Sequence, residues 1–187
     1  MTSEPNNRPV QHIGKTDLKA GDIISTNSQW LTHEQLSHAI LYTGTRLGHM
    51  YVADATEDGV TTAQLLYKLH LATYAAVFRH RSATPEQLAS ACQWAIMQAQ
   101  LHKPYDGRNA AHADNSQFSR LGRLIILSEK ESAARHFKSE NASFTCSELV
   151  FRAFEIGGAA LTPEPVRCTS PGMMFQTDKL AYMGRLI

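Results

Sequence analysis

The sequence lacks the features that mark membrane-spanning, exported or nucleic-acid-binding proteins. No apolar run approaches the roughly 18 residues needed to span a bilayer, and residues 1 to 15 are polar and contain two prolines. Lysine and arginine number 18 and aspartate and glutamate 17, which leaves no field of one sign to hold a polyanion. We therefore expect no integral membrane segment, no nucleic-acid partner, and synthesis in the cytoplasm without a secretory signal.

Cysteine is scarce, and the common metal and phosphate motifs are missing. Three widely spaced cysteines do not form a disulfide framework and fit thiols kept reduced in the cytosol. The nine histidines include no His-Glu-x-x-His spacing, and no Cys-x-x-Cys occurs. The Gly-x-Ser-x-Gly elbow of serine hydrolases and glycine-rich phosphate loops are absent as well. The sequence thus predicts no metal site and no cofactor.

What the chain does contain is a cysteine at a predicted helix start. Thr145 and Glu148 are spaced as in a capping box, in which each side chain satisfies a backbone N–H of the first turn. Apolar residues then recur at helical spacing until Gly157-Gly158 ends the helix. The N–H groups and dipole of such a helix end favour a thiolate over a thiol. Cys146 is therefore a candidate nucleophile.

The other two cysteines have simpler interpretations. A cysteine is more often a small buried hydrophobe than a nucleophile. Cys92 falls on the apolar face of a helix predicted over residues 84 to 102, so we expect it in the core. Cys168 follows Arg167 in a proline-bounded loop with no histidine placed to serve it, and we expect it to be a poor nucleophile.

The candidate base is His38, which opens a run of β-forming residues from 38 to 43. A second such run covers residues 50 to 55, and a hairpin centred on residues 45 to 47 would join the two. That register would place opposite one another the pairs Tyr42 with Met50, Ile40 with Val52, and His38 with Asp54. Opposed residues share a face of the sheet, so the Asp54 carboxylate would fix the tautomer of the imidazole and stabilise the imidazolium.

The remaining pattern predicts an α+β protein. Residues 1 to 17 read as an irregular N-terminal arm, and residues 18 to 187 as a single domain. Residues 106 to 140 have two interpretations, a flap over the site or a helical insert. The expected elements are a strand over 22 to 25, a short helix over 63 to 69, a strand over 74 to 79, the helix over 84 to 102, and a C-terminal short helix and edge strand within 173 to 187.

Taken in order, these segments resemble the circularly permuted NlpC-type papain-like cysteine hydrolases. In papain-like enzymes of ordinary order the cysteine precedes the histidine, whereas here His38 precedes Cys146, as in the permuted group. The resemblance covers roughly residues 18 to 180. The matching segments are residues 18 to 24, 37 to 42, 52 to 55 with Gly59-Val60, 103 to 106, and the Cys146 helix start.

The resemblance implies a papain-like, circularly permuted architecture, in which a central antiparallel sheet packs against the helix that carries the cysteine. It assigns Cys146 as nucleophile, His38 as base and Asp54 as orienter, at a position where the family often has glutamate. Three further residues are candidates for oxyanion binding or substrate positioning: the backbone N–H of Ser147, Tyr105 and Ser37. For Tyr105 the alternative is a plain turn through Pro104, Asp106 and Gly107.

The implied activity is hydrolysis of an amide through an acyl-enzyme, without metal or cofactor. The expected substrate is a peptide or acyl-amide, most simply a peptidoglycan stem peptide. Without an export signal, such an enzyme would reach the cell wall by signal-independent secretion, as an antibacterial effector paired with an immunity protein.

Two other classes remain open. One is a lipid-active acyl hydrolase or acyltransferase resembling lecithin:retinol acyltransferase, although those relatives usually carry a membrane anchor. The other is a non-catalytic binding module. The sequence does not indicate the oligomeric state.

Overall fold

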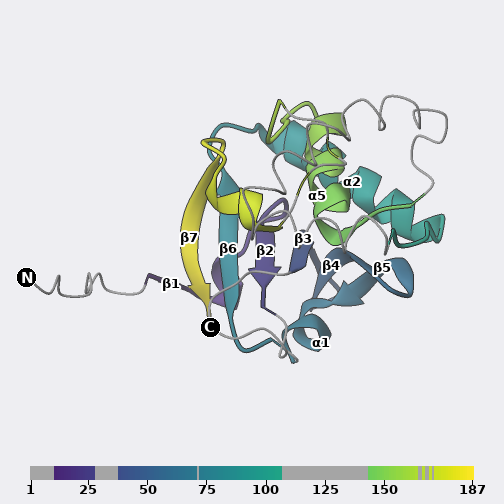
Figure 1. Ribbon diagram of the computed structural model, residues 1–187. Helices are drawn as coiled ribbons and strands as arrows, with labels where there is room; N and C mark the ends of the chain where they lie inside the picture. Colours follow the sequence, from purple (N-terminus) through teal and green to yellow (C-terminus); the bar gives the residue numbers. More distant parts are fainter. Residues whose placement is uncertain are drawn as a thin grey trace, which may run out of the picture.

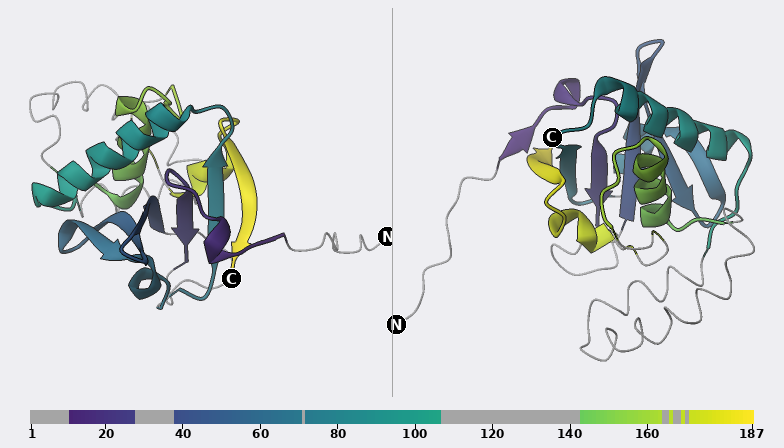
Figure 2. Two further views of the ribbon diagram at one scale, coloured as in Figure 1. Left: turned by 180° about the vertical axis from the view of Figure 1, so that it is seen from behind. Right: turned by 90° about the horizontal axis from the view of Figure 1, so that it is seen from above.

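The computed structural model describes residues 11–27, 38–70, 72–106, 143–163, 166, 169 and 171–187. Within these residues the fold is α+β: strands form one mixed sheet, and helices α2 (Pro85–Gln100) and α5 (Cys146–Ile156) lie side by side over one face of it. Figures 1 and 2 show this layered arrangement. The α+β class predicted from the sequence is confirmed at this level.

The sheet of the described residues has seven strands in the order β1-β7-β6-β2-β3-β4-β5. Neighbouring strands are antiparallel except β1 and β7, which run parallel. The strands are β1 (His12–Ile13), β2 (Ile23–Thr26), β3 (His38–Arg46), β4 (His49–Thr56), β5 (Gly59–Gln64), β6 (Ala75–His80) and β7 (Leu180–Leu186).

Short helices complete the described fold. Helix α1 (Leu65–Leu69) follows β5 directly, and two 3-10 turns, η1 (Lys15–Asp17) and η4 (Pro171–Phe175), precede β2 and β7. Helix α2 begins at a capping box: the Thr84 hydroxyl accepts from the N–H of Gln87, whose side chain accepts from the N–H of Thr84. The helix predicted here is confirmed to within two residues of its expected end.

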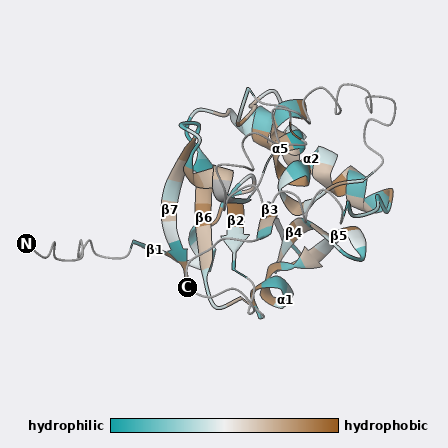
Figure 3. Cartoon of the chain, in the orientation of Figure 1, coloured by the Kyte–Doolittle hydropathy of each residue, from teal (hydrophilic) through white to brown (hydrophobic). Residues whose placement is uncertain are grey.

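Both faces of the sheet are apolar because alternate strand residues point to opposite sides. Ile23, Leu41 and Phe78 pack with α5 residues on the α2 and α5 side. Their neighbours Ile24 and Ile40 belong to a second cluster on the other face. Figure 3 shows the predominance of apolar residues along β6, near the middle of the sheet. The central strands are therefore buried on both sides.

The predicted register of the β3–β4 hairpin is wrong by two residues. Tyr42 pairs with Val52 instead of Met50, and the turn is formed by Leu47-Gly48 instead of residues 45 to 47. Both turn residues have positive φ, 50° and 78°, which is the geometry that two-residue hairpin loops prefer. The sequence has no Asn-Gly or Asp-Gly pair here and therefore carries no strong signal for this turn.

A bulge follows in the same hairpin. The register shifts between Tyr42 and Gly44, which leaves Thr43 as an extra residue on β3. Gly44 has φ of 110°, a conformation that residues with a Cβ rarely adopt. The Thr43 hydroxyl donates to the backbone oxygen of Tyr51, which ties the bulge to β4.

Three smaller differences concern the ends of elements. Residues 63 and 64, expected in a helix, extend β5, and residues 12 to 17, expected to be irregular, form β1 and η1. Strand β7, expected at the edge, is covered by β1 on its outer side. The predicted flap or insert over 106 to 140 lies outside the described residues except for Asp106.

A buried ion pair fixes the start of β2. The Arg79 guanidinium in β6 donates to both carboxylate oxygens of Asp22, each at 2.6 Å, and the backbone N–H of Lys19 donates to the same side chain. Asp22 is 1% exposed. The pair anchors β2 between β3 and β6, and so supports the strand that carries His38.

No helix among the described residues is long and apolar enough to cross a membrane.

Candidate active site

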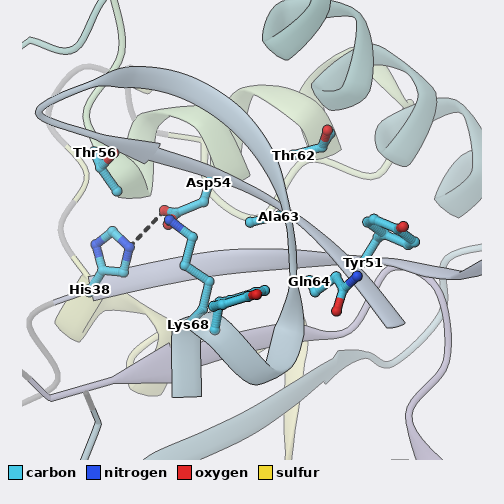
Figure 4. A pocket seen from close by; sticks show the side chains of 9 residues that line it. His38, Tyr51, Asp54, Thr56, Thr62, Ala63, Gln64 and Lys68 are labelled. Carbon is cyan, nitrogen blue, oxygen red and sulfur yellow. Dashed lines mark hydrogen bonds and ion pairs between the residues drawn. The ribbon is translucent and has the colours of Figure 1, made fainter. Parts of the chain in front are cut away.

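His38 and Asp54 meet on one face of the sheet. His38 is the first residue of β3, and its Nε2 lies 2.7 Å from Oδ1 of Asp54 in β4. The His38 side chain is 28% exposed and that of Asp54 is fully buried. Figure 4 shows the imidazole pointing at the carboxylate. The contact predicted from the sequence is present, although the register predicted for it is not.

The contact is present although the predicted register is wrong by two residues, because side chains in a strand alternate between faces with a period of two. Continued from Leu41 paired with Ala53, the observed register would place Thr56 directly opposite His38. Asp54 is two residues from that position and therefore points to the same face. Diagonal neighbours of this kind lie within reach of longer side chains.

Sequence reasoning missed a third member of this cluster. The ammonium of Lys68, from α1, lies 2.7 Å from Oδ2 of Asp54, so that each carboxylate oxygen faces a different cationic group. Burial alone would raise the pKa of Asp54, but the hydrogen bond to His38 and the charges of His38 and Lys68 hold it below its usual value. No local pattern signals Lys68, because only the fold brings α1 over β4.

Cys146 lies where the sequence predicts, at the first position of α5. Thr145 is the N-cap: its hydroxyl accepts from the N–H of Glu148 at 3.2 Å, and the Glu148 carboxylate accepts from the N–H of Thr145 at 2.8 Å. The predicted capping box is confirmed. Cys146 is 6% exposed and is the first residue of the first turn of α5. Backbone N–H groups of such a turn have no partner within the helix.

His38 links Asp54 to Cys146. Burial lowers the pKa of His38, but hydrogen bonds to Asp54 and Cys146 and the charges of these two groups outweigh it and raise the pKa to about 10. Because Nε2 faces Asp54, the nitrogen available to Cys146 is Nδ1. A thiol, an imidazole and a carboxylate in series form the nucleophile, base and orienter arrangement of covalent hydrolases.

The secondary candidates have different outcomes. Ser147 is the second residue of α5, and its hydroxyl donates to the backbone oxygen of Thr169 at 2.9 Å, which leaves the backbone N–H as the group relevant to the prediction. Cys92 is buried against α5 and β3, as expected for a core residue, and burial raises its pKa to about 11. Ser37 and Cys168 lie outside the described residues.

Tyr105 lies beside the segment that leads into Cys146. It forms a parallel bridge with Phe144, flanked by hydrogen bonds from the N–H of Asp106 to Phe144 and from the N–H of Phe144 to Pro104. Its ring packs against an apolar cluster that includes Phe144 and Leu149. Tyr105 therefore supports the approach to α5, and its role in substrate positioning stays a prediction.

A pocket of about 640 Å³ opens at the Asp54 side of His38. Its walls come from β3, β4, β5 and α1, as Figure 4 shows, and its lining residues are His38, Tyr51, Asp54, Thr56, Thr62, Ala63, Gln64, Tyr67 and Lys68. Most of the lining surface is apolar, although five of the side chains carry a hydroxyl or amide group. Among the described residues, no group of three or more His, Cys, Asp and Glu side chains is arranged to hold a metal ion.

Comparison of the chain with protein-family models, with curated proteins and with solved structures finds no match.

Proposed function

We propose that the protein is a cysteine hydrolase that cleaves an amide bond through a covalent acyl-enzyme. The observation that carries the proposal is the position of His38, whose Nε2 lies 2.7 Å from Asp54 and whose pKa is also raised by the Cys146 thiol at the start of α5. A purely structural histidine does not require a thiol on one side and a buried carboxylate on the other. In covalent catalysis by cysteine, an adjacent base of this kind activates the thiol and a third group orients the base.

The proposed reaction has two halves. In the first, the Cys146 thiolate attacks the substrate carbonyl carbon, a C–S bond forms, and the N–H groups of Cys146 and Ser147 bind the oxyanion. As the C–N bond breaks, His38 gives its proton to the leaving amine. In the second half, neutral His38 takes a proton from water, hydroxide adds to the thioester, and the C–S bond breaks to release the carboxylic acid and restore the thiolate and imidazolium.

The order of the residues and the elements that carry them support a papain-like fold of the circularly permuted NlpC type. His38 and Asp54 lie on neighbouring antiparallel strands, and Cys146 begins a helix packed on the same sheet. From this resemblance we propose a peptidoglycan stem peptide as substrate and antibacterial delivery as the biological setting.

The test of the proposed chemistry is the pH dependence of cysteine alkylation by iodoacetamide, mapped by mass spectrometry. Cys146 is expected to react well below the pH of about 8.5 at which an ordinary thiol ionises, and to lose this advantage in His38→Ala. Cys92, buried in the core, is the internal control. An alkylation profile for Cys146 that matches an ordinary thiol in both proteins would remove the basis of the proposal.

Substrate class is tested with the same protein and Cys146→Ala. Release of new amino termini from purified stem peptides, absent in Cys146→Ala, supports the amidase. Fatty acid release from phospholipid vesicles instead would assign the site to lipid chemistry. Directed to the periplasm, the active protein is expected to harm cells that tolerate Cys146→Ala, and equal growth with both would contradict the antibacterial role.

A further inference from the structure

The Asp54 carboxylate has two cationic partners where the proposed chemistry uses one. Oδ1 lies 2.7 Å from Nε2 of His38 and Oδ2 lies 2.7 Å from Nζ of Lys68, while Asp54 itself has no exposed surface. Lys68 is 24% exposed and faces the pocket beside the site. Figure 4 shows the Lys68 side chain reaching the Asp54 carboxylate, and the two cationic groups lie at different oxygens of that carboxylate.

The proposed reaction makes the second partner necessary. His38 is a cation before attack and neutral after it has protonated the leaving group. In that second state, a buried carboxylate with His38 as its only partner would face a neutral ring. An uncompensated charge in the interior is costly, and such a group takes up a proton or leaves its position. Either change would remove the acceptor that orients the imidazole.

We propose that Lys68 is a positioning residue, whose ammonium keeps Asp54 ionised and in place while His38 is neutral. The inference rests on the proposed hydrolase function, since only a reaction cycle makes His38 alternate between its two states. Lys68 touches neither the thiol nor the reacting carbonyl. It acts through Asp54.

The described surroundings favour this role over a chance surface contact. The ionisable groups that face the cluster are His38 from β3, Asp54 from β4, Lys68 from α1 and, beyond His38, Cys146 from α5. Tyr51 and Tyr67 line the adjoining pocket. No second carboxylate lines that pocket among the described residues, so Asp54 is the acid available there to Lys68.

The experiment follows the titration of His38 by NMR of its ring protons in a Cys146→Ala background, which removes the thiol from the equilibrium. Removing the ammonium in Lys68→Met takes a positive charge from beside the pair, and the titration midpoint of His38 should rise by roughly one pH unit. Lys68→Gln keeps a donor for Oδ2 without the charge and should give the same rise. Lys68→Arg should restore the original midpoint.

Lys19→Met, which removes an exposed lysine before β2, is the matched control and should leave the midpoint unchanged. An unchanged midpoint in both Lys68→Met and Lys68→Gln, with folding confirmed by circular dichroism, would overturn the inference. If Lys68→Met does not fold, Lys68→Gln against Lys68→Arg decides the question alone.

The activity measurement separates this inference from the proposed function. With Cys146 restored, Lys68→Met should slow turnover about tenfold or more, with Lys68→Arg recovering most of it, and KM should change less than kcat. A shifted His38 midpoint in a protein without thiol reactivity would contradict the hydrolase and leave the pairing role standing. Normal turnover and an unchanged His38 midpoint in Lys68→Met would contradict the role proposed for Lys68 but not the proposed hydrolase function.

Discussion

At the scale of single residues, the candidate site combines groups that the sequence indicates with one that it does not. Cys146 is signalled by its cap, and His38 and Asp54 by two adjacent β-forming runs. Lys68 lies in a short helix whose sequence is ordinary, and its contact with Asp54 depends on how α1 crosses β4. Local patterns cannot encode such a contact, because they specify an element and not its neighbours.

The raised pKa of His38 predicts how stability depends on pH. The folded state binds the proton more tightly than the unfolded chain, in which the pKa is near 6.5, so the stabilisation is complete below pH 6.5. It is lost as pH rises towards 10. The difference in unfolding free energy between the wild type and His38→Gln, measured with urea, should therefore fall steadily from pH 7 to pH 10.

Groups that titrate similarly in both proteins cancel in this difference, which isolates the His38 cluster. A difference that is constant from pH 7 to pH 10 would contradict the raised pKa. A difference that grows with pH would mean that His38 is neutral in the folded state.

At the scale of elements, the β3–β4 bulge determines which face His38 occupies relative to Asp54. Near the turn, Arg46 pairs with His49. If this register continued along β3, the residue opposite His38 would be Glu57, three residues from Asp54. Because side chains alternate between faces, an odd separation would place His38 and Asp54 on opposite faces of the sheet. Past the bulge, Leu41 pairs with Ala53 and the parity is reversed. The extra residue therefore brings the imidazole and the carboxylate together.

Deletion of Thr43 should break this arrangement. Without the bulge, β3 keeps the register set by the turn, and His38 and Asp54 point to opposite faces. The expected result is loss of the His38 dependence of Cys146 alkylation in a protein that still unfolds cooperatively. Thr43→Ala keeps the residue count and loses the hydroxyl bond to Tyr51, so it should retain that dependence. Equal behaviour of the deletion and of Thr43→Ala would refute the parity argument.

At the scale of the whole molecule, the α+β class and most elements follow from the sequence, whereas the sheet order does not. Capping boxes predict α2 and α5 to within a few residues. The predicted register of the β3–β4 hairpin is wrong because the turn is formed by Leu47-Gly48 and a bulge lies next to it. Neither feature has a strong signal in the sequence. The place of β7 between β1 and β6 depends on pairing across almost the full chain.

The ion pair between Asp22 and Arg79 should be a large contributor to overall stability. Removing one member of a buried pair leaves an uncompensated charge, so Arg79→Met should lower the unfolding free energy by about 3 kcal/mol. Urea unfolding monitored by circular dichroism measures the change, with Glu57→Gln, at an exposed position in the β4–β5 turn, as control. A loss below about 1 kcal/mol would mean that water already screens the pair.

The position of β7 also bears on how the protein is made. The chain emerges from the ribosome starting at its N-terminus. Strands β2 to β6, with His38, Asp54 and Lys68, can therefore associate before Cys146 has been synthesised. Strand β7, which lies between β6 and β1 in the sheet, is synthesised after the other described strands. Nascent chains that have emerged only through β6 are then expected to bring His38 and Asp54 together without Cys146, and to complete the described sheet only once β7 has emerged. The reactivity proposed for Cys146 would thus arise only after strands β2 to β6 have been synthesised.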